Sequence, residues 1–168
     1  KVGIVMHQKS SHLQNALFNN VLGLPSGTLG ADVLTQGKKQ LAENYSDISQ
    51  IEHEKVISVS EHTGFYSIKT NKNKYKTTIV VLALNYAKPF LIKGLENYIE
   101  PHQRAKAVKD RIQLKNDGYL VTKGLYVCGT LSGCRSQFAI AAGSGATVAT
   151  DILTLWNEGE HSQVHDKI

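Results

Sequence analysis

The sequence predicts an α/β fold, and three segments carry that prediction. Residues 2–5 form a short apolar run bounded by polar residues, which is too short for a helix and predicts a buried strand. Residues 79–84 are hydrophobic on both faces, which is typical of a strand in the centre of a covered, parallel sheet. A third apolar run, residues 124–129, ends in glycine and precedes a helical pattern. Strand, tight turn and helix in this order predict a βα unit with a ligand at the carboxyl end of the strand.

The remaining elements follow from turn residues and hydrophobic periodicity. Asn, Gly and Pro predict a loop over residues 19–27, Thr28 is a plausible N-cap, and apolar residues at three- and four-residue steps predict a helix over 30–44. Three β-branched and aromatic runs, 56–60, 65–70 and 75–79, predict an antiparallel meander. A second helix is expected over 137–156. Its predicted sheet-facing side is made of Ala139, Ala142, Ala146, Ala149, Leu153 and Trp156.

Length and composition predict one globular domain over residues 1–168, with the meander at about 56–79 inside it. The chain has 168 residues, of which 41% are hydrophobic and 20% charged. Its longest clearly apolar run, residues 79–84, is far below the ~20 residues of a bilayer span, so no membrane helix is expected. The sequence starts at Lys1 rather than at methionine, which is compatible with processing, cleavage or an incomplete chain.

The net charge permits an anionic partner without requiring one. Nineteen Lys and Arg against fourteen Asp and Glu give +5. Segment 102–115 is rich in basic residues, namely Arg104, Lys106, Lys109, Arg111 and Lys115. Such a run is typical of a solvated surface, with an anion or partner site as the alternative. Nucleic-acid binding is not favoured, because no aromatic platform accompanies the charge.

Cysteine and histidine patterns exclude several kinds of site. Cys128 and Cys134 are too few for a disulfide framework and lack CxxC spacing, so a cytoplasmic protein is expected. The seven histidines lack metal-ligand spacing and are interpreted as surface residues. Cys134 lies just before a predicted helix, where a thiol pKa can be lowered, but a bystander thiol is the preferred interpretation.

The turn after the third strand is the most informative candidate site. Gly129 ends the strand, and the first helical amides near Gln137, Phe138 and Ala139 present N–H donors and a positive dipole end. An anionic or electron-rich ligand would suit this position. The alternative is a tight strand-to-helix connection that binds nothing.

Segment 124–146 resembles the carboxy-terminal flavin motif of the thioredoxin reductase-like FAD-dependent oxidoreductases, usually written G-L-[FY]-A-x-G-D followed by a Gln and A-A-G-x-G. Residues 20–25 and 27–34 resemble the family's E-N-[FY]-x-G-[FL]-P and G-x-x-x-x-[ED]-L-L, and residues 78–85 resemble its strand ending A-T-G. The three segments occur in the family's order. The resemblance covers most of the chain and is weakest between residues 89 and 118.

The resemblance implies a three-layer FAD/NAD(P)-binding-like domain: a parallel sheet with helices on one face and the meander on the other. Thr130 takes the position of an Asp that binds the ribityl chain, and the helix amides would face the flavin's pyrimidine edge. Backbone groups at Val56 would face adenine, and residues 84 and 85 would lie near the diphosphate and adenosine. The implied cofactor-binding residues are Val56, Leu84, Asn85, Gly129, Thr130, Gln137, Phe138 and Ala139.

Departures from the family pattern weaken the expected cofactor site. No G-x-G-x-x-G turn precedes residue 2, Met6 and His7 stand where an acidic residue is usual, and Thr130 and Asn85 replace Asp and Gly. The NADPH domain and its CxxC are absent, so NAD(P)H is not expected to bind and FAD binding is expected to be weak or lost. The resemblance implies an FAD-dependent oxidoreductase or a truncated part of one, and the alternative is a non-catalytic, flavoprotein-derived binding or assembly module.

A homo-oligomer or a complex with a partner chain is also expected. The family's first strand is central in its sheet, so its loss would expose apolar surface or unpaired strand edges.

Overall fold

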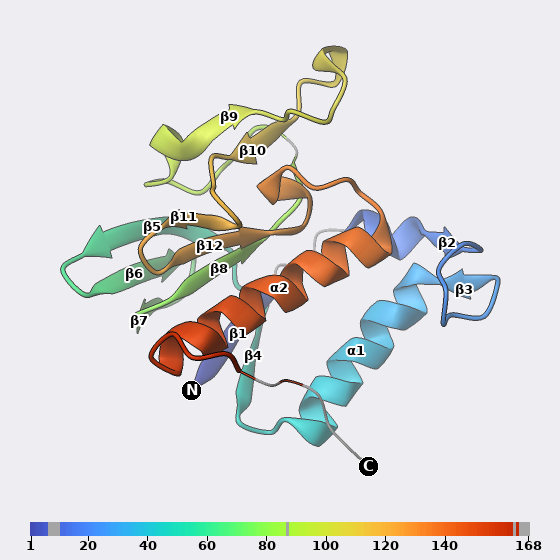
Figure 1. Ribbon diagram of the computed structural model, residues 1–168, viewed down its shortest axis with the longest axis horizontal. Helices are drawn as coiled ribbons and strands as arrows, with labels where there is room; N and C mark the ends of the chain where they lie inside the picture. Colours follow the sequence, from blue (N-terminus) through green and yellow to red (C-terminus); the bar gives the residue numbers. More distant parts are fainter. Residues whose placement is uncertain (7–10, 87, 163, 165–168) are drawn as a thin grey trace. The chain divides into compact units, whose positions relative to one another are not determined.

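A computed structural model describes residues 1–6, 11–86, 88–162 and 164 (Figure 1). The chain folds into two compact units, one made of residues 1–60 and 67–76 and the other of residues 61–66 and 77–168. The predicted mixture of helices with parallel and antiparallel strands is confirmed. The description as one domain stays a prediction, and the two units are described in turn.

The first unit is built on a parallel pair of strands. β1 (Val2–Met6) runs beside β4 (Ile48–Glu52), in register from Val2 and Ile48 to Met6 and Glu52. α1 (Gly30–Asn44) precedes β4, so the predicted strand over 2–5 and helix over 30–44 are both confirmed. The short strands β2 (Leu17–Phe18) and β3 (Thr28–Leu29) pair antiparallel across the predicted loop, and η1 (His12–Asn15) precedes them. β4 is a strand that the sequence analysis missed.

The start of α1 differs from the prediction. Leu29 is the N-cap, and the expected cap, Thr28, instead donates its hydroxyl proton to the carbonyl oxygen of Pro25 at 2.6 Å. The hydroxyl therefore closes the preceding turn. At Gly30 a Cβ atom would lie 1.9 Å from the carbonyl oxygen of Leu13, so only glycine lets α1 begin against η1.

The meander forms as predicted, with β5 (Val56–His62), β6 (Phe65–Thr70) and β7 (Lys74–Thr77) adjacent in chain order. A buried carboxylate is hydrogen-bonded to the part of the meander that belongs to the first unit. Glu54, 5% exposed, accepts hydrogen bonds from the Thr70 hydroxyl at 2.6 Å, the Asn73 amide at 2.5 Å and the Tyr75 hydroxyl at 3.0 Å. These neutral donors satisfy a charge that would otherwise be costly to bury.

The second unit contains another parallel pair. β12 (Leu125–Cys128) lies between β8 (Val80–Ala83), which is parallel to it, and β11 (Leu120–Thr122), which is antiparallel. The predicted parallel pairing is confirmed, but β8 is an edge of this sheet and β12 is its centre. Burial agrees with this correction, because all four β12 residues are buried whereas Val81 of β8 is 41% exposed.

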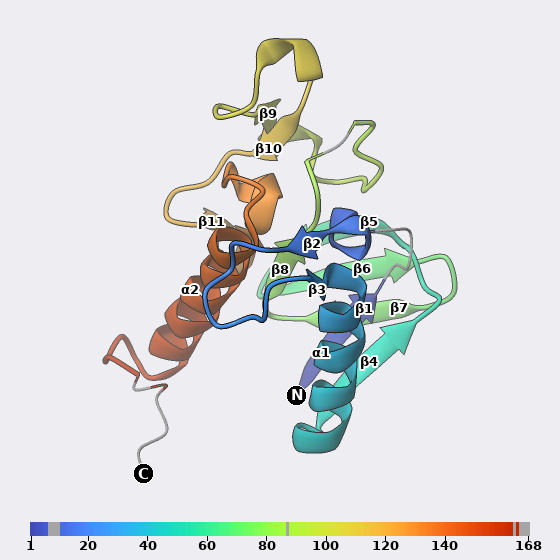
Figure 2. The ribbon, with the colours of Figure 1, turned by 90° about the vertical axis from the view of Figure 1, so that its right-hand side faces the viewer.

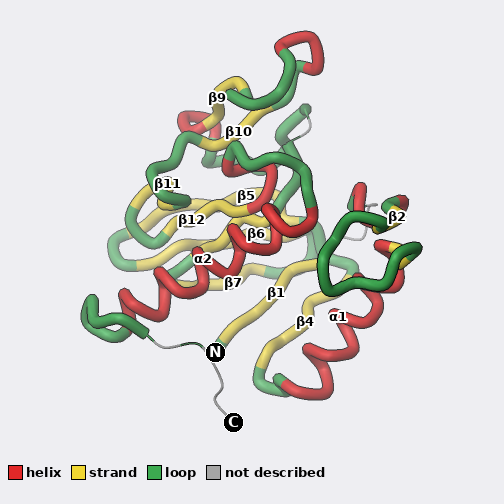
Figure 3. The backbone as a smooth tube through the Cα atoms, turned by 45° about the vertical axis from the view of Figure 1, so that its right-hand side comes forward, coloured by secondary structure: helices red, strands yellow, loops and turns green. Residues whose placement is uncertain are grey.

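α2 (Phe138–Trp156) forms where predicted and runs along β12 (Figure 3). The predicted contact face is wrong. The buried residues are Ser144, Val148 and Ile152, and the last two pack against Tyr126 and Cys128 of β12. Branched side chains at four-residue spacing bury more apolar surface than alanine methyl groups. The expected face is largely exposed, including Leu153 at 39% and Trp156 at 60%.

α2 bears on the expectation that the chain has no membrane helix, which stays a prediction. Among the described residues it is the one helix long and apolar enough, by length and composition, to cross a bilayer. The sequence analysis looked for an uninterrupted apolar run. That criterion overlooks this helix, because small and hydroxyl-bearing residues are interspersed among its apolar residues. The helix is buried only in part, through Ser144 and through Val148 and Ile152, which pack against β12.

An antiparallel ribbon of β9 (Ile99–Pro101) and β10 (Ile112–Leu114) extends from the same unit (Figure 2). Short 3-10 helices, η2 (Glu96–Tyr98), η3 (Ala107–Lys109) and η4 (Gly129–Ser132), lie in the connections. Ile112 and Leu114 are 1% and 0% exposed. The basic segment 102–115 is therefore only partly a solvated surface, since it contains a buried strand.

Candidate functional site

The carboxyl ends of β8 and β12 bring four of the candidate residues together. Ala83 and Cys128 are register partners at these ends, so Leu84 and Asn85 continue one strand beside Gly129 and Thr130. The Thr130 hydroxyl approaches the carbonyl oxygen of Leu84 at 3.5 Å, the outer limit of a hydrogen bond. The polar backbone and side-chain groups of both strand ends therefore meet at one edge.

Gly129 starts the turn that leads to α2. Its φ of 68° lies in the left-handed region, where glycine carries no steric penalty. Its N–H donates to the Ser144 hydroxyl oxygen at 2.7 Å, and the Ser144 hydroxyl donates to the Ala141 carbonyl at 2.7 Å. Ser144, which the sequence analysis missed, is 2% exposed and ties the turn to α2. Its only sequence signal was a polar residue within the small-residue segment.

The other candidates in the second unit lie at the start of α2, as predicted. Gln137 is the N-cap and makes no side-chain capping bond, and Phe138 and Ala139 are the first two helical residues. The Ala141 N–H closes the first turn on the Gln137 carbonyl at 2.9 Å. The positive end of the α2 dipole is thus at these residues. Val56 begins β5 in the first unit, and its role as a cofactor-binding residue stays a prediction.

The two cysteines are buried, free thiols. Burial raises the pKa of the Cys128 thiol, which disfavours the nucleophilic thiolate. Cys134 accepts a hydrogen bond from Ser132 at 3.3 Å and lies 3.7 Å from the Tyr119 hydroxyl. That contact is the main reason why the pKa of Tyr119 is raised.

The histidine prediction needs one correction. His12, His53, His62 and His161 are exposed, whereas His102 is 8% exposed and lines a cavity of about 210 Å³ in the second unit. His7 and His165 lie outside the described residues. No sequence pattern indicated that His102 is buried, because Glu100, Gln103 and Arg104 beside it are charged or polar.

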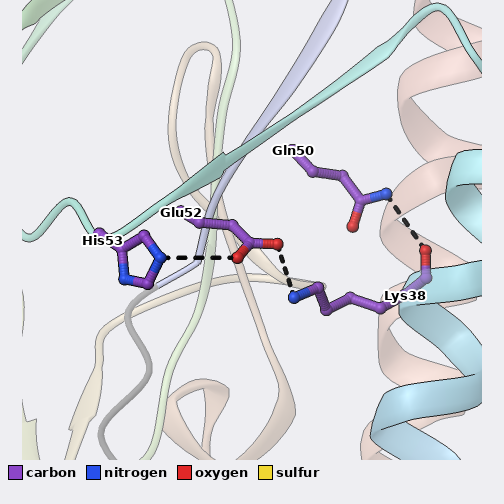
Figure 4. Close-up of polar contacts among 4 residues, drawn as sticks. All are labelled: Lys38, Gln50, Glu52 and His53. Carbon is purple, nitrogen blue, oxygen red and sulfur yellow. Dashed lines mark hydrogen bonds and ion pairs between the residues drawn. The ribbon is translucent and has the colours of Figure 1, made fainter.

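A cluster of polar and charged side chains lies at the carboxyl end of β4 in the first unit (Figure 4). The Lys38 ammonium lies 2.5 Å from the Glu52 carboxylate, and His53 approaches the same carboxylate at 3.9 Å. The Lys38 hydrogen bond is the main cause that lowers the pKa of Glu52. Gln50 donates to the Lys38 carbonyl at 3.2 Å, so the cluster fastens α1 to β4. Glu52 is an acidic residue at the end of a parallel strand, but the Lys38 ammonium neutralises the charge of its carboxylate.

Comparison with known proteins identifies the fold. No protein-family model and no curated protein matches the sequence. A ferredoxin-flavin thioredoxin reductase from Clostridium acetobutylicum is similar in structure, with a TM-score of 0.68 at 14% identity, over 94% of this chain and 89% of that one. A second structure of a ferredoxin-flavin thioredoxin reductase from the same organism gives 0.62 at 16% identity, over 88% and 87% of the two chains.

An oxidoreductase from Agrobacterium tumefaciens is also similar, with a TM-score of 0.67 at 10% identity, over 92% of this chain and 90% of that one. At these identities the likeness concerns the backbone arrangement. The mixed α/β chain described above therefore has the fold of thioredoxin reductase-like oxidoreductases.

Proposed function

We propose that this chain is an FAD-binding domain of an oxidoreductase of thioredoxin reductase-like type, or a part of one. The observation that carries the proposal is the meeting of the β8 and β12 ends at one edge of a parallel pair, where the Gly129 N–H is bonded to Ser144 of α2. Ligands of α/β folds bind at the carboxyl ends of parallel strands. The likeness to a ferredoxin-flavin thioredoxin reductase supports a flavin as the ligand. We further propose the three-layer arrangement that the family implies.

The residues present fit the ribityl chain and the flavin ring of FAD better than its diphosphate. Thr130 offers the ribityl chain a hydroxyl, and the α2 amides at Gln137–Ala139 would stabilise negative charge at the pyrimidine edge of the ring. Leu84 and Asn85 would lie near the diphosphate and adenosine. The flavin, when bound, supplies the redox chemistry. The sequence contains no G-x-G-x-x-G turn, so we expect weak FAD binding and no NAD(P)H binding.

Thr130→Asp tests the placement of the flavin. A hydrogen bond to a neutral group contributes about 0.5–1.5 kcal/mol and one to a charged group about 1.5–3 kcal/mol. A carboxylate at this position should therefore tighten FAD binding about tenfold. Fluorescence titration of the purified chain with FAD measures the change. Thr63→Asp, in the exposed turn between β5 and β6, adds the same charge elsewhere and should leave the affinity unchanged.

Equal or weaker binding by the Thr130→Asp variant would show that Thr130 is not at the ribityl position. Sub-micromolar FAD binding by the unaltered chain would contradict the expected weakness.

The alternative function is a non-catalytic binding or assembly module derived from a flavoprotein. Thr130 and Asn85 in place of the family's Asp and Gly favour it, because both changes remove cofactor contacts. The absorption spectrum of the purified protein separates the two functions. A bound yellow chromophore favours the oxidoreductase, and a colourless protein that FAD does not stabilise favours the module.

We also propose that the chain associates with itself or with a partner chain. In the second unit Val81, Ile140, Leu155 and Trp156 are 41%, 38%, 55% and 60% exposed, and no described strand covers the outer edge of β8. Exposed apolar residues and an open strand edge favour association. Light scattering should show species larger than the 18.4 kDa of one chain. A monomer at high concentration that binds no apolar dye would refute the proposal. A cytoplasmic location stays an expectation.

A further inference from the structure

The second unit holds a strongly basic cavity that the proposed flavin site does not use. Its volume is about 210 Å³, and its walls come from segment 102–109, from residues 134–136 just before α2, and from Tyr86. Four cationic side chains line it: Arg104, Lys106, Lys109 and Arg135. No acidic residue is among the lining residues, so the cavity concentrates positive charge and attracts anions.

The fold positions one of the cationic groups, that of Arg104, through a hydrogen bond rather than an ion pair. The Arg104 guanidinium donates through Nη1 to the Gly133 carbonyl at 2.8 Å, which fastens segment 102–109 to the turn before α2. The Gln113 side chain, which accepts from the Gln103 N–H at 3.0 Å, holds the same segment. Among the described residues, the nearby acidic Asp110 pairs with Lys88 and not with a lining cation. Arg104, Lys106, Lys109 and Arg135 thus form no ion pair in the part of the chain described.

His102 adds a polar group that lacks a partner. Its Nδ1 accepts the Arg104 N–H at 3.1 Å, so the neutral ring carries its proton on Nε2. That Nε2 is buried and has no hydrogen-bond partner, although the residue is only 8% exposed. A buried donor without an acceptor destabilises a fold, and a bound oxygen acceptor would relieve it.

We propose that this cavity binds the phosphate group of a small molecule other than the flavin. Arg is suited to phosphate because its planar fork makes charge-assisted bonds, and four cations match a group that carries up to two negative charges. The volume is below the range of roughly 300–1,000 Å³ that is usual for drug-sized ligands, so it suits a phosphate head rather than a whole dinucleotide.

The proposal is independent of the flavin proposal, since no candidate flavin residue lines the cavity. FAD also carries phosphates, so the experiment has to separate the two sites. Calorimetric titration of the full chain with inorganic phosphate, against sodium chloride at equal ionic strength, should give saturable binding of one equivalent.

Arg135→Gln and Lys106→Gln each remove one lining cation from a different segment and should each weaken phosphate binding at least about tenfold. Lys115→Gln, an exposed cation of the same unit outside the cavity, is the matched control and should change the affinity less than about twofold. His102→Asn leaves an amide oxygen for the Arg104 N–H but removes the ring donor, and should also weaken binding about tenfold. Thermal unfolding of each variant without phosphate reports whether it folds.

Phosphate binding no stronger than chloride binding would overturn the proposal. So would a Lys115→Gln effect equal to those of Arg135→Gln and Lys106→Gln, because the attraction would then be diffuse. Displacement of phosphate by FAD would assign the cavity to the cofactor and would overturn the second site. A final titration with glycerol 3-phosphate distinguishes the source: binding at least as tight as inorganic phosphate supports an organic phosphate, and much weaker binding supports free phosphate.

Discussion

Gly124 is a position where one added methyl group should be damaging. It lies between β11 and β12 with a φ of 78°, and a Cβ atom there would lie 2.7 Å from the Thr78 carbonyl oxygen and 3.3 Å from Cε2 of Tyr66. The Tyr66 hydroxyl donates to the Lys123 carbonyl at 2.7 Å, so this ring cannot move without loss of a hydrogen bond. Gly124→Ala should therefore strain the backbone and force β8 and β12 apart.

The expected cost has two parts. A left-handed conformation costs an alanine about 1–2 kcal/mol, and overpacking against atoms that cannot relax costs about 1–3 kcal/mol more. Gly64→Ala is the matched control, because Gly64 has a φ of 82° and nothing within 4 Å of its Cβ position. The two variants share the backbone strain and the change in unfolded-state entropy, so their difference isolates the clash.

Thermal unfolding followed by circular dichroism measures that difference. For a protein of this size 1 kcal/mol shifts Tm by about 2–4 °C, so Gly124→Ala should unfold about 2–12 °C below Gly64→Ala. Equal Tm values for the two variants would refute the reasoning, because they would show that β8 moves away from the added methyl group at no cost.

Two further substitutions test the packing described above. Ser144→Ala leaves the Gly129 N–H without its acceptor and should lower the free energy of unfolding, measured by urea denaturation, by about 1–3 kcal/mol. Thr147→Ala is the control: it removes an exposed hydroxyl that is bonded to the Gly143 carbonyl, and it should change the free energy of unfolding little. Hydrogen bonds from Thr70, then Asn73 and Tyr75, lower the pKa of Glu54 below its ordinary value of 4.5. Its stabilisation is therefore present above that value and is lost as pH falls through the folded pKa, and Glu54→Gln should flatten the urea midpoint between about pH 5 and pH 3. An unflattened profile, or equal costs of the serine and threonine changes, would count against these assignments.

The sequence by itself determined the elements whose periodicity is strong. The strand over 2–5, the helix over 30–44, the meander and the strand-turn-helix unit at 124–156 all form where the residues predict them. These elements depend on local preference and on the spacing of apolar residues, which a sequence displays directly. β4 was missed because Ser49 and Gln50 interrupt its apolar residues, and the pairing with β1 that stabilises it is long-range.

Tertiary structure alone decided which faces are buried and which charges meet. Four of the six residues on the predicted contact face of α2 are alanines, yet Val148 and Ile152 face β12, because the surface buried depends on the partner as well as on the helix. Likewise, the sequence predicts that the basic segment 102–115 is a solvated surface, but the fold buries Ile112. The fold also brings Arg104 to the same cavity as Arg135, which is 31 positions away in the printed sequence (135 − 104). Contacts between distant segments are set by packing of the whole unit, and no local pattern in the sequence encodes them.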